Sequence, residues 1–162
     1  MIEFNRLLVP IDLGEGTNHI TDVATDMAAK LGAKVTLLHA FMVPAAVYAE
    51  GCELPIQGMI QSAEAALQKT LDRVRKQYPN TDALLVRGDP WEQILEVAEE
   101  RRADMIVMGT HGRRGLSHLL LGSVAERVVR TSRIPVLTVA FVGGQRTKDV
   151  ALDGQAAAKI RE

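Results

Sequence analysis

Short apolar runs alternate along the chain with longer stretches in which an apolar residue recurs every third or fourth position. The runs lie at residues 7–11, 35–41, 83–86, 105–108 and 135–141. A nearly continuous apolar run of this length is typical of a parallel strand that is buried on both faces. The pattern therefore predicts five strands.

The intervening stretches have helical spacing. The first has the apolar positions Ile20, Val23, Ala24, Met27, Ala28 and Leu31 and ends at Gly32, which suits a C-terminal cap. Residues 42–58 are irregular and are predicted as a loop, and a second helix is expected from Ala63 to Tyr78. A third begins at Asp89-Pro90, where a capping residue precedes a first-turn proline. A fourth follows Gly122-Ser123.

Alternating strands and helices predict an α/β fold, here a single-domain, doubly wound, five-stranded parallel sheet with helices on both faces. We expect the strand order 3-2-1-4-5, and a length of 162 residues suits one domain. The domain should span residues 1–142. The polar, weakly patterned residues 143–162 are expected to form a tail that is flexible or docked on a partner.

A glycine-punctuated loop follows the fourth predicted strand and leads into the fourth helix. Its glycines are Gly109, Gly112, Gly115 and Gly122. Glycines let a backbone approach a ligand closely, and the free N–H groups at a helix start favour phosphate. The order 3-2-1-4-5 brings this loop beside Asp12, at the switch point where such sheets bind ligands. The alternative is four unrelated turn glycines.

Several polar residues near this crevice have two interpretations. Asp12 either braces the first loop or accepts hydrogen bonds from a ribose. Ser123 with Glu126 forms a capping-box pattern, and a capping hydroxyl also lies within reach of a phosphate. Arg113 and Arg114 either contact phosphates or are solvated, and His39 and His111 are interpreted as structural or solvated rather than as metal ligands. No metal-ligand spacing is evident.

Other signatures argue against several classes of protein. No glycine leads into the Lys-Ser/Thr of a P-loop, and Gly14-Glu-Gly16 lacks the third glycine of a dinucleotide fingerprint. No nucleophile elbow occurs. The net charge of −1 gives no reason to expect nucleic acid, and no apolar run approaches a membrane span. The single Cys52 and the absence of a signal pattern predict a cytoplasmic location.

Gly109, Gly112, Gly122 and Ser123 fit the pattern Gly-x2-Gly-x9-Gly-Ser/Thr, placed after a strand and before a helix. Together with Val9-Pro10-Ile11-Asp12 and the approach to the last strand at residues 133–137, this pattern resembles the ATP-binding branch of the universal stress protein family. The resemblance covers residues 5–141.

This resemblance implies a role for each matching residue. Asp12 would bind the ribose, and the backbone at Pro10 and Ala40 would frame the adenine, with Ala40 smaller than the aliphatic residue common there. The glycines Gly109 and Gly112 would line the ribose–phosphate path. The phosphates would lie at Gly122, Ser123 and Val124, with Mg or Mn as a possible divalent cation. A homodimer through Val136, Leu137, Val139 and Phe141 is also implied, and pairing would cover an apolar edge.

The sequence thus predicts an ATP-binding stress-response sensor or regulator with at most slow ATP hydrolysis and no assigned catalytic residue. A fast ATPase needs a group that orients the attacking water, and none is assigned here. Two alternatives remain open: a nucleotide-free dimeric interaction module, and a nucleotidyl-transferase-like enzyme. The physiological nucleotide and any further protein partner are also left open.

Overall fold

The computed structural model describes residues 3–43, 53–110 and 121–140 of the chain. Five parallel strands form one sheet in the order β3-β2-β1-β4-β5, which confirms the predicted fold class and strand order. The strands are β1 (Arg6–Pro10), β2 (Lys34–Phe41), β3 (Thr81–Arg87), β4 (Met105–Gly109) and β5 (Val136–Val139).

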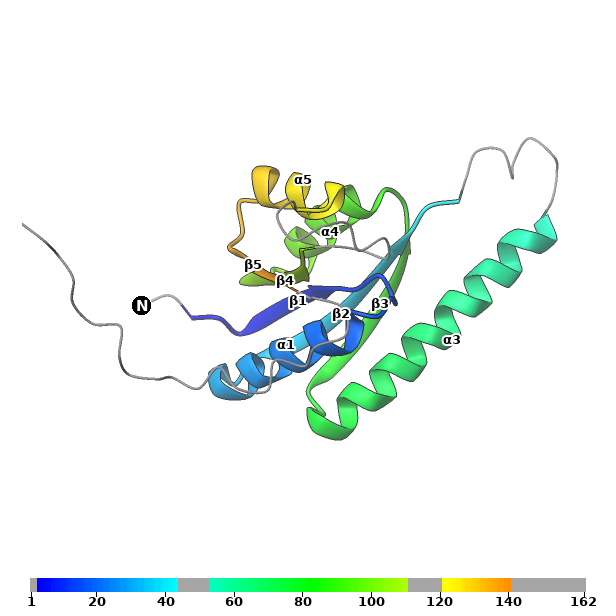
Figure 1. The fold of residues 1–162 in the computed structure, drawn as a ribbon. Coiled ribbons are helices and arrows are strands. Elements are labelled where there is room, and N and C mark those ends of the chain that lie inside the picture. Colours follow the sequence, from blue (N-terminus) through cyan, green and yellow to red (C-terminus); the bar gives the residue numbers. More distant parts are fainter. Residues whose placement is uncertain (1–2, 44–52, 111–120, 141–162) are drawn as a thin grey trace, which may run out of the picture.

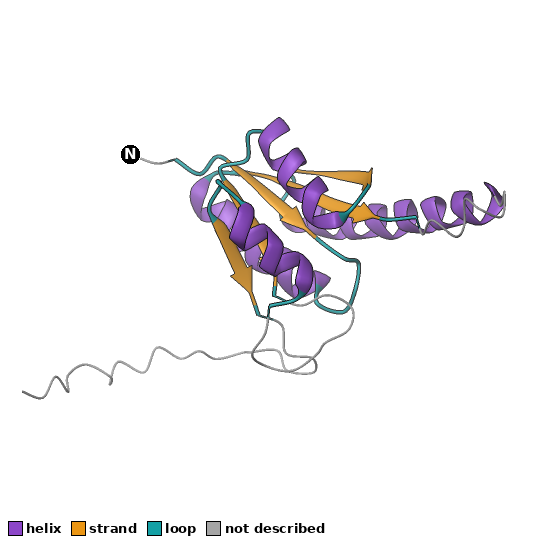
Figure 2. Ribbon diagram, turned by 90° about the horizontal axis from the view of Figure 1, so that it is seen from above, coloured by secondary structure: helices purple, strands orange, loops and turns teal. Residues whose placement is uncertain are grey.

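Helices cover both faces of this sheet (Figures 1 and 2). On one face lie α1 (Thr17–Leu31) and α3 (Glu53–Gln77), and on the other lie α4 (Pro90–Glu100) and α5 (Ser123–Thr131). Successive strand residues point to opposite faces, so Val9 joins the core under α1 and α3 whereas Leu8 joins the core under α4. Two apolar cores therefore hold the sheet between them.

Helix α1 ends as expected, and its predicted apolar stripe packs on the core except at Leu31. Gly32 adopts a left-handed φ of 68° and its N–H donates to the Ala28 carbonyl, which confirms the predicted cap. Leu31, predicted to be buried, is 42% exposed, whereas Thr21 is fully buried. The Thr21 hydroxyl tolerates burial because it donates to the Thr17 carbonyl one turn earlier.

The prediction of a loop up to Gly58 was wrong, because α3 already begins at Glu53. Pro55 is the third residue of the helix. The first N–H groups of a helix have no acceptor within it, so a proline there costs no hydrogen bond. Gly58 lies inside the helix and a Cβ there would meet open space. Neither residue therefore interrupts the helix.

The strand boundaries differ by only a few residues from the prediction. β3 begins two residues earlier and β5 ends at Val139 rather than at residue 141. Residue 141 and the predicted tail at 143–162 lie outside the described residues. Within the described chain, no helix is both long enough and apolar enough to cross a membrane.

Candidate functional site

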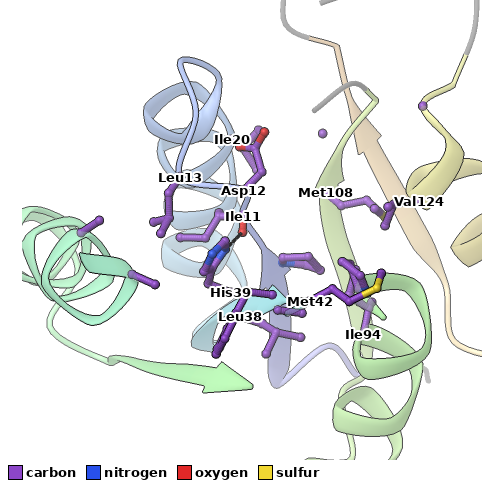
Figure 3. Close-up of a pocket in the computed structure, with 18 of the residues that line it drawn as sticks. Ile11, Asp12, Leu13, Ile20, Leu38, His39, Met42, Ile94, Met108 and Val124 are labelled. Atoms are coloured by element: carbon purple, nitrogen blue, oxygen red, sulfur yellow. Dashed lines mark hydrogen bonds between the residues drawn. The ribbon is translucent and has the colours of Figure 1, made fainter. Parts of the chain in front are cut away.

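A cavity of about 1220 Å³ opens at the carboxyl ends of β1, β2 and β4. Figure 3 shows its walls, which come from the strand ends and from helices on both faces of the sheet. Seven of the eight site residues predicted from the sequence lie in its lining: Pro10, Asp12, Ala40, Gly109, Gly122, Ser123 and Val124. The eighth, Gly112, lies outside the described residues. Residues far apart in the sequence thus meet at the predicted switch point.

The cavity opens because β1 stops pairing with β4. The Ile11 N–H donates to the Leu38 carbonyl on β2 at 2.8 Å, so the main chain of the preceding Pro10 faces β4. Proline has no N–H to continue the ladder on that side. The β1–β4 register ends accordingly at Leu8 and Ile106. Pro10 therefore marks the point where the two central strands separate.

Main-chain polar groups of two strands face the space that β1 leaves. On β2, the Leu38 carbonyl accepts from Ile11, and Ala40 points its main chain to the same side as Leu38. Just after β4, the Thr110 N–H donates to the Val139 carbonyl of β5. Because successive residues of a strand point their main-chain groups to alternate sides, the main chain of the preceding Gly109 points toward β1. Both residues line the cavity and present main-chain groups beyond the end of β1.

The turn after β1 holds Asp12 at the mouth of the crevice. Its Oδ1 accepts the Gly14 N–H at 2.9 Å, which is the bracing role that the sequence allowed. The residue between them, Leu13, has a φ of 62°, a left-handed conformation unusual for a non-glycine residue. The Asp12 carboxylate also lines the cavity, so bracing the turn does not remove it from the site.

Helix α5 presents its N-terminus to the same cavity. Its N-cap is Gly122, whose N–H donates to the Thr110 carbonyl at 2.7 Å and so joins the two ends of the glycine loop. The capping-box interpretation of Ser123 is therefore wrong, since Ser123 is the first helical residue. Glu126 makes the first bond within the helix, to the Gly122 carbonyl, which leaves the Ser123, Val124 and Ala125 amides ahead of it.

The rest of the wall is mostly apolar. Met108, Ile94 and Leu38 face the α4 side of the cavity, and Leu13 and Ile20 face the α1 side (Figure 3). Helix α3 adds the small residues Gly58, Ser62, Ala63 and Ala66. The α3 wall is not predictable from the sequence, because the pattern places Gly58 in a loop and the alanines on an ordinary buried helix face.

His39 contributes a buried polar group to this wall. It is only 7% exposed, and its Nδ1 lies 2.8 Å from the Ile11 carbonyl oxygen. The interpretation of His39 as a structural histidine agrees with this bond. His111, Arg113 and Arg114 lie outside the described residues. Among the residues that are described, no cluster of three or more His, Cys, Asp or Glu is arranged to hold a metal ion.

The fold and cavity define a class: an α/β protein whose ligand crevice lies at a strand-order switch point and is lined by main-chain groups and a helix N-terminus. Residues 3–140 match the model of the universal stress protein family, and the chain belongs to that family. It is 32% identical over 139 residues to universal stress protein MJ0531 of Methanocaldococcus jannaschii, covering 84% of this chain and 82% of the relative.

Solved structures share the fold. The structure of protein MJ0577 superposes with a TM-score of 0.73 at 28% identity, covering 87% of this chain and 99% of that one. A universal stress protein in complex with cAMP superposes with a TM-score of 0.64 at 27% identity, covering 86% and 99%. A structural relative of this chain therefore holds an adenine nucleotide.

Proposed function

We propose that this chain is a cytoplasmic ATP-binding member of its family that acts as a nucleotide-dependent stress-response regulator. Three independent parts of the cavity support this proposal, one for each part of the nucleotide. The main chain of Ala40 faces the space left by β1, the Asp12 carboxylate lies at the turn, and α5 presents its N-terminus. The complex of a related protein with cAMP supports an adenine nucleotide as the ligand class.

The observation that carries the proposal is the direction of the Ala40 main chain. An N–H donor and a C=O acceptor of one residue match the N1 acceptor and the N6 amino donor of adenine. Guanine presents the reverse, an N1–H donor beside an O6 acceptor. The site should therefore prefer adenine, with Pro10 and the apolar wall at Met108 and Ile94 against the ring.

The ribose would bind the Asp12 carboxylate. One of its oxygens accepts the Gly14 N–H, and carboxylate oxygens are acceptors of the kind to which sugar hydroxyls donate. Gly109, whose main chain faces the crevice, would lie beside the path from ribose to phosphate, and we assign Gly112 to the same path.

The phosphates would lie at the start of α5. Because the Gly122 N–H already bonds to Thr110, the amides offered to phosphate are those of Ser123 and Val124, together with the Ser123 hydroxyl. Gly122 would contribute by its lack of a side chain. A divalent cation, Mg or Mn, would reduce the repulsion between the phosphates. We assign no catalytic residue, and any hydrolysis should be slow.

We also propose that the chain forms a homodimer through β5. This strand is an edge of the sheet, and its Leu137 is 36% exposed. Pairing with a second copy would cover that edge. The prediction included Val139 in the contact surface, but Val139 is only 8% exposed and packs in the core. Phe141 lies outside the described residues.

Calorimetry on protein stripped of nucleotide tests the ligand. We expect ATP to bind at sub-millimolar concentration, and GTP at least tenfold more weakly because its base mismatches the Ala40 main chain. No ATP binding would refute the proposal, and equal binding of GTP would refute the role of Ala40.

Gly122→Val tests the phosphate site. Gly122 has a φ of −61° and a ψ of 154°, which valine adopts readily, so the fold should be retained. The branched side chain should abolish ATP binding by blocking the approach to α5. Thr131→Val, at the exposed last residue of the same helix and outside the cavity lining, is the control and should bind ATP normally. Unchanged affinity in Gly122→Val would place the phosphates elsewhere.

A further inference from the structure

His39 and Ile11, which both line the cavity, are joined by a buried hydrogen bond (Figure 3). A carbonyl oxygen only accepts, so the His39 Nδ1, 2.8 Å away, carries the proton and donates it. His39 lies on β2, and Ile11 immediately follows β1. The bond therefore spans two neighbouring strands at the point where one of them ends.

Ile11 is held through both of its main-chain groups. Its N–H donates to the Leu38 carbonyl, which continues the sheet, and its carbonyl accepts from His39. That carbonyl belongs to the peptide unit that joins Ile11 to Asp12. Because a peptide unit is planar, fixing the direction of this carbonyl also fixes the direction in which the chain enters Asp12.

We infer that His39 is a positioning residue for the Asp12 carboxylate, an inference that rests on the proposed role of Asp12 in holding the ribose. The turn that follows Ile11 is held by the Asp12 carboxylate, which accepts the Gly14 N–H, and Leu13 between these two residues has a left-handed conformation. Without the imidazole, the Ile11 carbonyl would be buried without this donor or would rotate. Rotation would turn the Ile11–Asp12 peptide and move the carboxylate away from the sugar hydroxyls.

Two substitutions separate this role from simple packing. His39→Leu keeps an apolar side chain of moderate size but removes the donor. His39→Asn is smaller, yet its amide N–H lies close to the position of Nδ1 and can still donate to Ile11. We expect His39→Leu to weaken ATP binding about five- to tenfold, the range for one lost hydrogen bond. His39→Asn should recover most of that loss.

The sugar provides a readout that a general loss of packing would not move. 2′,3′-Dideoxy-ATP lacks the hydroxyls that Asp12 would hold, so His39→Leu should weaken its binding little. Asp12→Ala should have the same selective effect, and the double variant should lose no more than Asp12→Ala alone, because both changes remove one interaction. Equal losses for ATP and dideoxy-ATP, or additive effects, would overturn the inference.

The ligand-free protein gives an independent test that remains valid if the chain binds no ATP. Amide hydrogen exchange at Gly14 reports the bond to Asp12. Exchange should accelerate in His39→Leu and remain close to the unmodified rate in His39→Asn, with circular dichroism confirming that both are folded. Unchanged Gly14 exchange in His39→Leu would overturn the positioning role. Failure of ATP binding in the unmodified protein, with the exchange result intact, would refute only the proposed function.

Discussion

Leu13 adopts a backbone conformation that its side chain disfavours. With a φ of 62° it lies in the left-handed region, which costs an L-residue roughly 1–2 kcal/mol. The turn keeps this conformation because Asp12 accepts the Gly14 N–H on one side of it and the Leu13 side chain packs against the α1–α3 core. Strain of this kind concentrates at ligand sites.

Substitutions at Leu13 should therefore depend on branching more than on size. Valine at positive φ is a steric outlier, whereas methionine has nearly the volume of leucine and no β-branch. We expect Leu13→Val to lower the free energy of unfolding by about 1 kcal/mol more than Leu13→Met does. Urea denaturation of the two variants measures the difference. Equal stabilities would show that the φ of Leu13 carries no such strain.

The sequence indicated which residue types lie at the site but not how their main chains point. The sequence shows both the glycine motif from Gly109 to Ser123 and the position of Asp12 after a strand. The motif residues that the structure describes line the same cavity as Asp12. The directions of the Pro10 and Ala40 main chains depend on which neighbour each residue faces in the sheet. That information exists only once the register is known.

At the scale of elements, the start of α4 combines a helix cap, an ion pair and a cation–π contact. Asp89 is the N-cap, and its carboxylate accepts the Trp91 N–H at 3.4 Å, as the sequence predicted from Asp89-Pro90. The same carboxylate lies 3.9 Å from the Arg127 guanidinium on α5, which in turn lies over the Trp91 ring. Asp89 thus links α4 to α5, whose N-terminus lines the cavity.

Removing this cap should cost less than a typical N-cap. A distance of 3.4 Å is longer than a good hydrogen bond, so we expect Asp89→Ala to lower the free energy of unfolding by about 0.5–1 kcal/mol, the lower part of the range for caps. Asp89→Asn keeps an oxygen acceptor and loses only an exposed ion pair, so it should stay within about 0.5 kcal/mol of the unmodified protein. Thermal and urea unfolding measure both. A larger loss in Asp89→Asn than in Asp89→Ala would contradict the capping role.

The strands were easier to predict than the helices for a physical reason. A parallel strand covered on both faces needs an apolar residue at nearly every position, and this requirement located all five strands. Helix α3 was mislocated at its start because Pro55 and Gly58 are loop-forming residues in most settings. In the first turn a proline costs nothing, and a single interior glycine costs only about 1 kcal/mol.

At the scale of the whole molecule, the strand order explains both the position of the cavity and the position of β5 at an edge of the sheet. β1 and β4 are central, and the chain leaves them toward opposite faces, so their carboxyl ends separate. The last strand, β5, then lies at an edge beside β4. Thr110, which immediately follows β4, links the ligand site to the edge strand, since its carbonyl accepts the Gly122 N–H while its own N–H donates to the Val139 carbonyl.

The proposed homodimer follows from the direction of the main chain in β5. The carbonyls of Pro135 and Val139 face β4, so the main chain of Thr138 faces outward from the sheet. A second copy that pairs with this edge would need the Thr138 N–H. Thr138→Pro removes that donor without removing a bond to β4, and edge strands tolerate proline.

We expect the unmodified chain to sediment as a dimer at micromolar concentration and Thr138→Pro as a folded monomer, whereas Thr138→Val, which keeps the N–H, should remain dimeric. A monomeric unmodified chain, or a dimeric Thr138→Pro, would mean that β5 is not the interface, and its exposed Leu137 would then need another explanation.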